Sequence, residues 1–539
     1  MNRLCKAKWG GKTYVILFFL MFGLIFSRYC YYGFTYWQQL DDYIQYHNYT
    51  AYNSDISELI DRLGLLSSRP LAGLADIYLW SHFYGRMIAA VAVISAMYAA
   101  SAVFFHRVFS RQFGTGALFF VVYALLPLGI EGTYWVSASS RIVAGLFFAS
   151  LSLLFFDRWC YKGRALNLLL FAIFQLAAFC FYEQIVLLSG AATLVVMLTG
   201  FGRDKKRPLW GFLMFAGAAI YFAITKLAEP GVYGARTQLF LPWQENWWQE
   251  CFLPAVKQVG YVFSVGMFAT LGRGLKRGFL ILVSEPNIIC ITVFAALCAA
   301  MFFLLKGIKS AKARFWTEFL AGLFLAAAPL LLFFVLKSPW FGVRNAVPSF
   351  LGLALMLDSV FSLIFGRLRS AAAVQAAVVS SLCLLCCIAA VSEIHDYRET
   401  TTADQQIAKT AAEAIVSDGW TEGGKIWLLN VEATYAENAN FFYHEHVYGV
   451  TSSDWALTGA IYAYAGRGDL PTVSPLPRHS PVAGGGFDPG TAQCYFYLDG
   501  ELVRVALEAG SGGEWLITGS SNKNYGVIAI SDGSVQLIT

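Results

Sequence analysis

Two adjacent carboxylates, Asp41 and Asp42, follow the first apolar run of the chain and come directly after Tyr36-Trp37-Gln38-Gln39-Leu40. Charges are costly to place near such an aromatic-rich boundary, which makes the pair a functional candidate. One carboxylate could act as a general base on an acceptor hydroxyl. Together the two could share a divalent cation. The structural alternative is a solvated loop start or a helix N-cap, where Asp is favoured.

Two arginines stand beside apolar segments. Arg69 occurs in Ser67-Ser68-Arg69-Pro70-Leu71, and Arg344 occurs in Trp340-Phe341-Gly342-Val343-Arg344-Asn345. A guanidinium can bind a phosphate through two parallel hydrogen bonds, so both residues are candidates for phosphate binding. For Arg69 the alternatives are a salt bridge to Asp41, Asp42 or Asp76, or a contact with a lipid head group.

Two further short segments combine aromatic, acidic and basic side chains. Their candidate residues are Tyr134, Trp135 and Arg141 in the first, and Tyr182, Glu183 and Gln184 in the second. Aromatic rings with hydroxyls and a charge make a good sugar-binding surface, although Tyr and Trp are also ordinary residues of membrane interfaces. An acid flanked by apolar residues, as Glu183 is, is a functional candidate by default. A structural ion pair with Arg141 is the competing explanation.

A third motif, His444-Glu445-His446, would place both imidazoles on one side of a strand. It lacks the HExxH spacing of a helical zinc site, so the sequence does not favour a metal there.

The elements that must position these residues are membrane helices. Of the 539 residues, 57% are hydrophobic and only 14% are charged, whereas ordinary soluble domains carry about 25% charge. The composition indicates a polytopic α-helical membrane protein and excludes a soluble enzyme, a disordered chain and a fibrous protein. The net charge of +5 (39 basic minus 34 acidic residues) gives no indication of nucleic-acid binding.

The hydropathy pattern predicts about eleven transmembrane helices, since a bilayer core needs about 20 apolar residues per crossing. The predicted spans are 13–28, 87–104, 115–130, 142–156, 165–182, 184–200, 209–226, 287–305, 316–336, 347–365 and 371–392. No small-residue cleavage site follows the first span, so we expect a retained anchor and not a signal peptide.

Basic clusters set the expected orientation. Under eleven spans they all fall on one side of the membrane, which the positive-inside rule assigns to the cytoplasm. The clusters are Arg3–Lys12, Arg107 with Arg111, Arg158–Arg164, Arg203–Arg207, Lys306–Arg314, and Arg367 with Arg369. The chain is then expected in the cell membrane with a cytoplasmic N-terminus and an extracytoplasmic C-terminal domain. Residues 258–284 contain three basic residues. If they crossed the membrane once, every later basic cluster would lie on the outer side. We therefore expect an amphipathic helix at the outer interface, although a hairpin that enters the membrane and returns would keep the later clusters on the cytoplasmic side equally well.

The composition also divides the chain into two domains. Residues 1–392 form the predicted transmembrane domain, with long outer loops at 29–86 and 227–286. Residues 393–539 form a predicted small C-terminal α/β domain outside the membrane. It is expected to contain a helix at Thr402–Val416 and strands at Lys425–Asn430, Cys494–Leu498, Trp515–Thr518 and Tyr525–Ile530.

Acids in the first outer loop, an Arg-Pro-Leu after them, and polar motifs on each later outer loop together resemble the GT-C superfamily of membrane glycosyltransferases. Within it, the chain looks most like the GtrII-type bacterial glucosyltransferases. The resemblance covers roughly residues 13–365 and leaves the tail out. The motifs that carry the resemblance are short. The resemblance rests on their order along the chain and on their expected position on the same side of the membrane.

This resemblance implies a polyprenyl-phosphate-linked sugar donor, used on the outer face, and a glycan acceptor of the cell envelope. Asp41 or Asp42 would be the catalytic base, Arg69 and Arg344 would hold the donor phosphate, and Tyr182, Glu183 and Gln184 would line the same cavity. A lipid-anchored donor needs no cytoplasmic nucleotide site, and the sequence has no Gly-rich phosphate loop. Metal use stays open, because some members of the superfamily use a divalent cation and others do not.

Two other classes of function compete with the enzyme. A carrier or flippase for a lipid-linked glycan would also need outward arginines and aromatics, but it would need matching charges at membrane depth on both sides. A non-catalytic envelope assembly protein would make the tail the working part. An O-antigen-ligase-like enzyme is a nearer alternative that would transfer a whole glycan.

Overall fold

A computed structural model gives the fold of this chain. It describes residues 9–48, 67–200, 206–228, 239–308, 314–337, 339–366, 371–420, 424–436, 438–441, 443–478, 482–483, 487–511, 513–519, 523–531 and 534–538. They form two compact units. The helical unit comprises Met1–Tyr36, Asp55–Ile394 and Asn440–His444, and the sheet unit comprises Trp37–Ser54, His395–Ala439 and Glu445–Thr539.

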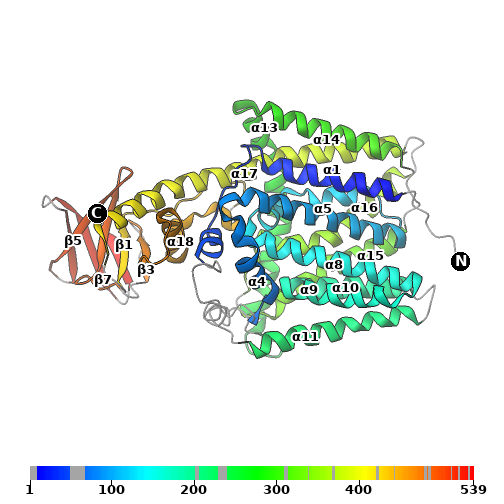
Figure 1. Cartoon of the computed structure of the whole chain (residues 1–539), viewed down its shortest axis with the longest axis horizontal. Coiled ribbons are helices and arrows are strands. Elements are labelled where there is room, and N and C mark those ends of the chain that lie inside the picture. Colours follow the sequence, from blue (N-terminus) through cyan, green and yellow to red (C-terminus); the bar gives the residue numbers. More distant parts are fainter. Residues whose placement is uncertain are drawn as a thin grey trace. The chain divides into compact units, whose positions relative to one another are not determined.

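The helical unit is a bundle of long apolar helices that lie side by side (Figure 1). Its main helices are α1 (Gly11–Tyr29), α5 (Met87–Gln112), α6 (Leu118–Ala124), α7 (Ile130–Thr133), α8 (Val136–Lys162), α9 (Ala165–Phe181), α10 (Glu183–Gly200), α11 (Leu213–Leu227), α14 (Ile288–Lys306), α15 (Phe315–Ala327), α16 (Phe350–Phe365) and the first part of α17 (Ala371–Asp418). The residues of α17 from His395 onward belong to the sheet unit. Short helices η4 (Pro127–Gly129), η10 (Ala328–Val335) and η11 (Val343–Ser349) extend or link them, and α4 (Pro70–Tyr78) and η3 (Trp80–Arg86) precede α5.

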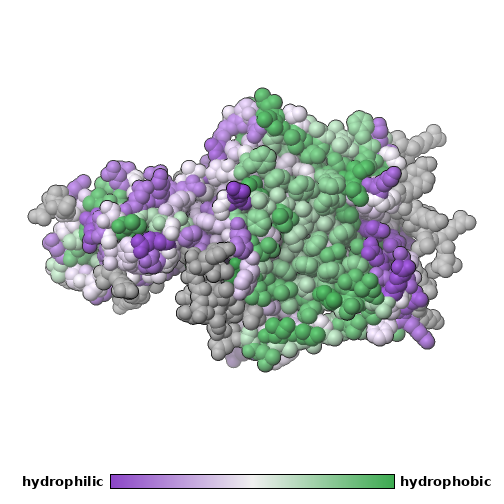
Figure 2. Space-filling model, in the orientation of Figure 1, coloured by the Kyte–Doolittle hydropathy of each residue, from purple (hydrophilic) through white to green (hydrophobic). Residues whose placement is uncertain are grey.

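Ten helical segments among the described residues are long and apolar enough to cross a bilayer, and two shorter apolar segments, Leu118–Thr133 and Ala165–Phe181, accompany them. Each of the eleven predicted spans falls on one of these segments. Hydrophobic side chains cover the visible face of the bundle (Figure 2). Phe19, Leu166 and Phe215 are each more than 60% exposed, which is favourable in lipid and costly in water. The fold class of a multi-pass helical membrane protein is thus confirmed.

Close helix packing in the bundle depends on a glycine where α15 meets α16. A Cβ atom added to Gly352 would lie 2.1 Å from the backbone nitrogen of Ala326 and 2.3 Å from the carbonyl oxygen of Gly322. Small residues let membrane helices approach to backbone contact, where dispersion forces are strongest. Gly352 therefore fixes the pairing of these two helices.

One long helical segment crosses an end of the bundle. It consists of η7 (Trp248–Phe252), α12 (Leu253–Tyr261), η8 (Val262–Gly266), η9 (Ala269–Arg273) and α13 (Gly274–Ser284). Its 37 residues would measure about 55 Å at 1.5 Å per residue, far more than one crossing needs.

Contacts along this segment show that it lies over helix ends. The indole of Trp247 donates to the carbonyl of Phe334 at 3.0 Å, and the side-chain oxygen of Gln258 accepts from the backbone N–H of Phe341 at 2.8 Å. Just beyond α13, the hydroxyl of Tyr31 donates to the carbonyl of Glu285 at 2.7 Å. Tyr31 follows α1, Phe334 lies near the end of η10, and Phe341 precedes η11, so these partners share one end of the bundle. The geometry agrees with the helix that the sequence predicts at 258–284.

The bundle therefore has two distinct ends. We call the end that carries residues 29–36, 127–136, 181–184, 336–337 and 339–346 the site end. The opposite end, called the basic end, carries residues 106–118, 157–164, 206–207, 306–308, 314–318 and 358–366. At the basic end the backbone N–H of Arg314 donates to the carbonyl of Phe113 at 3.1 Å. Several residues of the basic clusters lie outside the described residues. They are Arg3, Lys6, Lys8, Arg203, Lys205, Lys309, Lys312, Arg367 and Arg369.

The sheet unit contains an eight-stranded sheet in the order β2-β1-β4-β5-β6-β7-β8-β3. The strands are β1 (Lys425–Leu429), β2 (Thr472–Leu476), β3 (Val482–Ala483), β4 (Gln493–Leu498), β5 (Glu501–Ala509), β6 (Glu514–Gly519), β7 (Asn524–Ser531) and β8 (Ser534–Ile538). Strand β1 pairs in parallel with β2 and β4, and the other pairs are antiparallel. Helix α18 (Asp454–Ala465) packs on β2 through hydrogen bonds between Thr458 and Val473. Buried Trp427, Phe496 and Ile517 belong to the core.

The predicted α/β character of the tail is confirmed, with two differences in detail. The predicted helix Thr402–Val416 is the end of α17, which runs without interruption from the last span to Asp418. Strands β2, β3, β5 and β8 were not expected from the sequence. The sheet unit also takes up the short helices α2 (Asp41–Tyr43) and η1 (Ile44–Asn48) from the first predicted outer loop.

Candidate functional site

The site end of the helical unit holds a bidentate ion pair between Arg69 and Glu183. Nε and Nη2 of Arg69 donate to the two carboxylate oxygens of Glu183, each at 2.6 Å. Arg69 directly precedes α4, where Pro70 occupies the first helical turn and favours a helix start. Glu183 opens α10 after Tyr182, whose extended backbone makes the turn from α9. Glu183 is not among the partners that the sequence suggests for Arg69, which are Asp41, Asp42 and Asp76.

Electrostatics keep this guanidinium charged. Burial lowers the pKa of Arg69, but the charge of Glu183 and its hydrogen bonds outweigh burial and raise the pKa above the ordinary value. About 30% of each side chain stays exposed, so the pair is open to solvent on one side. The Nη1 group of Arg69 makes no hydrogen bond to Glu183 and can donate to a third group.

Tyr182 connects this pair to the start of η11. Its ring lies under the Arg69 guanidinium, with 4.7 Å from the guanidinium carbon to the ring centre. Its hydroxyl accepts a hydrogen bond from the amide of Asn345 at 2.9 Å. The amide of Gln184 in turn donates to the carbonyl of Asn345 at 3.2 Å. The three predicted cavity residues Tyr182, Glu183 and Gln184 thus lie in one group with Arg69, joined by hydrogen bonds and by the contact of its guanidinium with the Tyr182 ring.

Arg344 lies next to Asn345 and stacks on an aromatic ring. Its guanidinium carbon is 5.2 Å from the ring centre of Trp135, which is fully buried. Tyr134 is also buried and packs against Tyr29 and Tyr36 at ring-centre distances of 5.0 and 5.1 Å. Trp135 therefore supports an arginine, and neither aromatic ring offers a free face to a sugar in this structure.

A second ion pair holds α4 against α8. Arg141 of α8 donates to Asp76 of α4 at 2.8 Å, and both side chains are largely buried. Arg141 is thus paired with Asp76, whereas the sequence suggested Glu183 as its partner. The charge of Arg141 is still felt at both Arg69 and Glu183. The four charges form one cluster beside α4.

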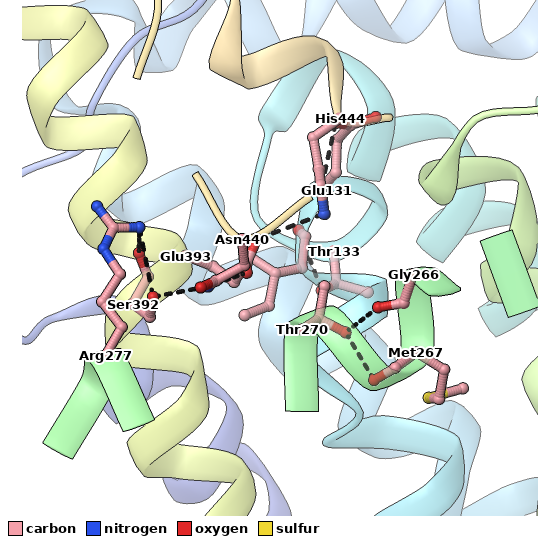
Figure 3. A network of polar contacts seen from close by, with 11 residues as sticks. Glu131, Thr133, Gly266, Met267, Thr270, Arg277, Ser392, Glu393, Asn440 and His444 are labelled. Carbon is pink, nitrogen blue, oxygen red and sulfur yellow. Dashed lines mark hydrogen bonds and ion pairs between the residues drawn. The ribbon is translucent and has the colours of Figure 1, made fainter. Parts of the chain in front are cut away.

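A buried histidine between two acids lies elsewhere at the site end (Figure 3). Nδ1 of His444 is 3.5 Å from Glu131, and Nε2 is 3.5 Å from Glu393. All three side chains are at most 1% exposed. Asn440 donates to Glu393 at 3.1 Å and to Ser392 at 2.7 Å, which extends the network along α17.

Local packing explains how Glu131 reaches this position. Helix α7 packs directly on η11, because a Cβ atom on Gly132 would lie 3.2 Å from the carbonyl oxygen of Arg344. The histidine motif is visible in the sequence, but no spacing rule connects residues 131, 393 and 444.

The distances bear on the chemistry of this group. A separation of 3.5 Å exceeds the usual N–H···O range. It is close to the spacing of two ligand atoms around a zinc ion bonded at about 2.0–2.2 Å. The two ring nitrogens of His444 point in opposite directions, so one cation could be held by His444 together with Glu131 or with Glu393, but not with both. His444 could equally carry a proton between the acids.

The acid pair belongs to the sheet unit. Asp42 is fully buried, and its Oδ2 atom accepts a hydrogen bond from the backbone N–H of Gln39 at 3.0 Å. The side chain of Gln39 is tied to α17 by a 2.7 Å hydrogen bond to Thr401. Asp41 is partly exposed. Asp41 and Asp42 thus lie in a different unit from the predicted phosphate-binding Arg69 and Arg344.

The backbone just before the acids is unusual. Leu40 has φ of 36° and ψ of −104°, a conformation that a branched side chain rarely adopts. Such a residue costs on the order of 1–3 kcal/mol and persists only where its surroundings enforce it. Strain of this kind is frequent at functional sites, and here it sets the direction of the two carboxylates that follow.

Comparisons with known proteins identify no family for this chain. A scan against protein-family models finds no match, and a search of curated proteins finds none either. Among solved structures, the chain is similar to the crystal structure of ArnT from Cupriavidus metallidurans bound to undecaprenyl phosphate. The identity is 12%, the TM-score is 0.39, and the match covers 91% of this chain and 94% of that one. At this level the likeness carries no argument about function.

Proposed function

We propose that the protein is a membrane glycosyltransferase that uses a polyprenyl-phosphate-linked sugar on the outer face of the membrane. The observation that carries the proposal is the cluster of Arg69, Arg141 and Arg344 around Tyr182 and Glu183 at one end of an apolar bundle. Guanidinium groups recognise phosphate through paired hydrogen bonds, and an apolar bundle suits a lipid chain. A polyprenyl phosphate combines both features in one molecule.

In this mechanism the arginines act on the leaving group. The acceptor hydroxyl attacks the anomeric carbon, and the bond between that carbon and the phosphate oxygen breaks. The lipid phosphate then gains negative charge, and Arg69 and Arg344 stabilise that charge in the transition state. Glu183 acts as a positioning residue, because it fixes Arg69 in one orientation before the donor binds.

The proposed base is Asp41 or Asp42, which would take the proton of the acceptor hydroxyl. Glu183 is the other acid near the arginines, but both of its oxygens accept hydrogen bonds from Arg69. A carboxylate held in this way is poorly placed to accept a proton. The strained Leu40 before the acid pair supports the functional assignment of Asp41 and Asp42.

A carrier for a lipid-linked glycan is the second candidate, and one observation favours it. The basic end holds two buried acids, Glu318 and Asp358, each fully buried. A carrier needs polar groups at both ends of its path, whereas a glycosyltransferase of the proposed type needs them at the donor site alone.

Binding of polyprenyl phosphate tests the proposal without knowledge of the sugar or the acceptor. Arg69→Lys and Arg344→Lys keep the charge but lose the two-pronged donor geometry. The loss of one charge-assisted hydrogen bond, about 1.5 kcal/mol, should weaken binding about tenfold. Arg467→Lys is the matched control, because Arg467 makes an exposed bidentate pair with Asp469 in the sheet unit. Unchanged affinity in both site variants, or an equal loss in the control, would reject the phosphate role.

A further inference from the structure

The basic end of the bundle contains two buried carboxyl groups that the proposed reaction does not use. Glu318 belongs to α15 and Asp358 to α16, and neither side chain has exposed surface. The two groups interact electrostatically. Within the part of the chain that the structure describes, neither forms an ion pair with a basic residue. Two negative charges enclosed together in apolar surroundings would be very costly.

Consecutive residues of one loop hold both carboxyls. The hydroxyl of Thr115 donates to Oε1 of Glu318 at 2.5 Å, and the backbone N–H of Gly116 donates to Oδ2 of Asp358 at 2.5 Å. The backbone N–H of Phe119 donates to Oδ1 of Asp358 at 3.3 Å. Asp358 is therefore solvated by peptide N–H groups, which suits the ionised form.

Glu318 has a different environment. Its second oxygen, Oε2, is buried and has no hydrogen-bond partner. An ionised carboxylate loses its solvation when it is buried, and without a hydrogen-bond donor nothing compensates this cost. A neutral carboxylic acid at the same place has a smaller desolvation cost because it carries no charge. The structure thus gives the two acids complementary roles, with Asp358 as the anion and Glu318 as the acid.

We propose that Glu318 and Asp358 form a proton-binding carboxyl pair, with the shared proton held on Glu318. A metal cation fits this site less well, because hydrogen-bond donors already face three of the four carboxyl oxygens. A proton needs a single free oxygen, and Oε2 of Glu318 supplies it.

A small cavity lies next to Asp358. It has a volume of about 30 Å³ and is lined by Asp358, Thr115 and Gly116 together with Trp9, Phe361 and Gln375. This is room for about one water molecule. Glu318 does not line the cavity, so a proton would reach it past Asp358.

Other titratable groups face the pair from the surrounding helices. His106 of α5 is buried and lies 3.0 Å from the carbonyl of Gly116, and Tyr14 of α1 lies 3.3 Å from the same imidazole. Arg314 lies one turn before Glu318 and has an exposed side chain. A pH response of the pair must therefore be assigned by substitution of Glu318 itself.

Reaction with dicyclohexylcarbodiimide tests the proposal on the full-length protein in detergent. This apolar reagent adds to a protonated carboxyl: the acid proton moves to a reagent nitrogen, the carboxyl oxygen bonds to the central carbon, and rearrangement gives a stable N-acylurea without a leaving group. Peptide mass spectrometry locates the adduct. We expect modification of Glu318 that slows as pH rises and is absent in Glu318→Gln.

Asp157 is the internal control, because it is equally buried at the same end but forms an ion pair with Arg111 at 2.8 Å. It should stay unmodified. Infrared spectroscopy gives a second reading that needs no reagent access: wild type should show the C=O band of a protonated carboxylic acid, and Glu318→Gln should lose it. No adduct on Glu318 together with no such band difference would overturn the proposal, as would modification of Asp157 at the same rate.

Discussion

The ion pair between Arg69 and Glu183 gives the sharpest test of how the site end works. In Glu183→Gln one acceptor oxygen becomes an amide group that donates, so one of the two 2.6 Å hydrogen bonds is replaced by a donor facing a donor. A hydrogen bond to a charged group is worth about 1.5–3 kcal/mol. The side chains are 29% and 32% exposed, so solvent screening favours the lower part of that range.

If Arg69 must be held in place to meet the donor phosphate, this loss appears in catalysis. A cost of about 1.5–3 kcal/mol corresponds to roughly a 10- to 100-fold decrease in kcat/KM. The assay is sugar release from a labelled polyprenyl-phosphate donor, normalised to folded protein. Wild-type kcat/KM in Glu183→Gln would refute the positioning role.

A charge exchange separates this role from a structural one. The double variant Arg69→Glu with Glu183→Arg can form the same ion pair in reverse, so thermal stability should return toward that of wild type. Activity should stay low, because the guanidinium then projects from α10 and not from the start of α4. Recovery of both stability and activity would show that only the pair matters, not the position of the arginine.

Two further predictions concern the bundle and its orientation. Gly352→Ala should lower the thermal unfolding temperature and the yield of folded protein, because the new Cβ would lie 2.1 Å from a backbone nitrogen of α15. The control Gly11→Ala, which has open space around it, should lower neither. Equal stability of the two variants would contradict the role of Gly352 in helix packing. In intact cells, a cysteine at exposed Ser531 should react with a membrane-impermeant maleimide and one at exposed Lys162 should not. The parent for both carries Cys5→Ser and Cys30→Ser, because Cys30 is only partly buried. The reverse labelling would reject the proposed orientation.

Much of the fold follows from the sequence because membrane helices leave a strong local signal. All eleven predicted spans coincide with apolar helices, since a lipid environment demands long apolar runs. The helix at 258–284 was expected for a different reason: a single membrane crossing there would place the later basic clusters on the wrong side of the membrane. Its full extent, from Trp248 to Ser284, exceeds the predicted segment because Gln249, Glu250 and Lys257 interrupt the apolar pattern of its first part.

The sheet unit was harder to predict. Strand β2 contains Pro475, which usually argues against a strand and is tolerated here because β2 is an edge strand of the sheet. Strand β5 carries Glu501, Arg504 and Glu508 among its apolar residues, so its alternation is weak. Helix α17 has no break at the end of the last span, and composition alone could not show that the helix continues.

The candidate site shows the limit of sequence reasoning most clearly. Its residues were found because charges and aromatics beside apolar runs are unusual. Their partners depend on long-range packing: Arg69 and Glu183 are 114 residues apart, and His444 meets Glu131 and Glu393 only in the folded bundle. The division of Asp42 and Arg69 between two units likewise follows from tertiary structure.

The proposed reaction is sugar transfer from a polyprenyl-phosphate donor, with Asp41 or Asp42 as the base. The most direct test measures sugar transfer, normalised to folded protein, in wild type, Asp41→Asn and Asp42→Asn. Asp488→Asn serves as a control at an exposed acid of the same unit. One general base contributes about 10²–10⁴-fold in rate, so at least one of the two site variants should lose nearly all transfer while it still binds donor. Near wild-type rates in both variants would place the base elsewhere, and a wild type that transfers no sugar but moves a lipid-linked glycan across liposomes would contradict the enzyme assignment.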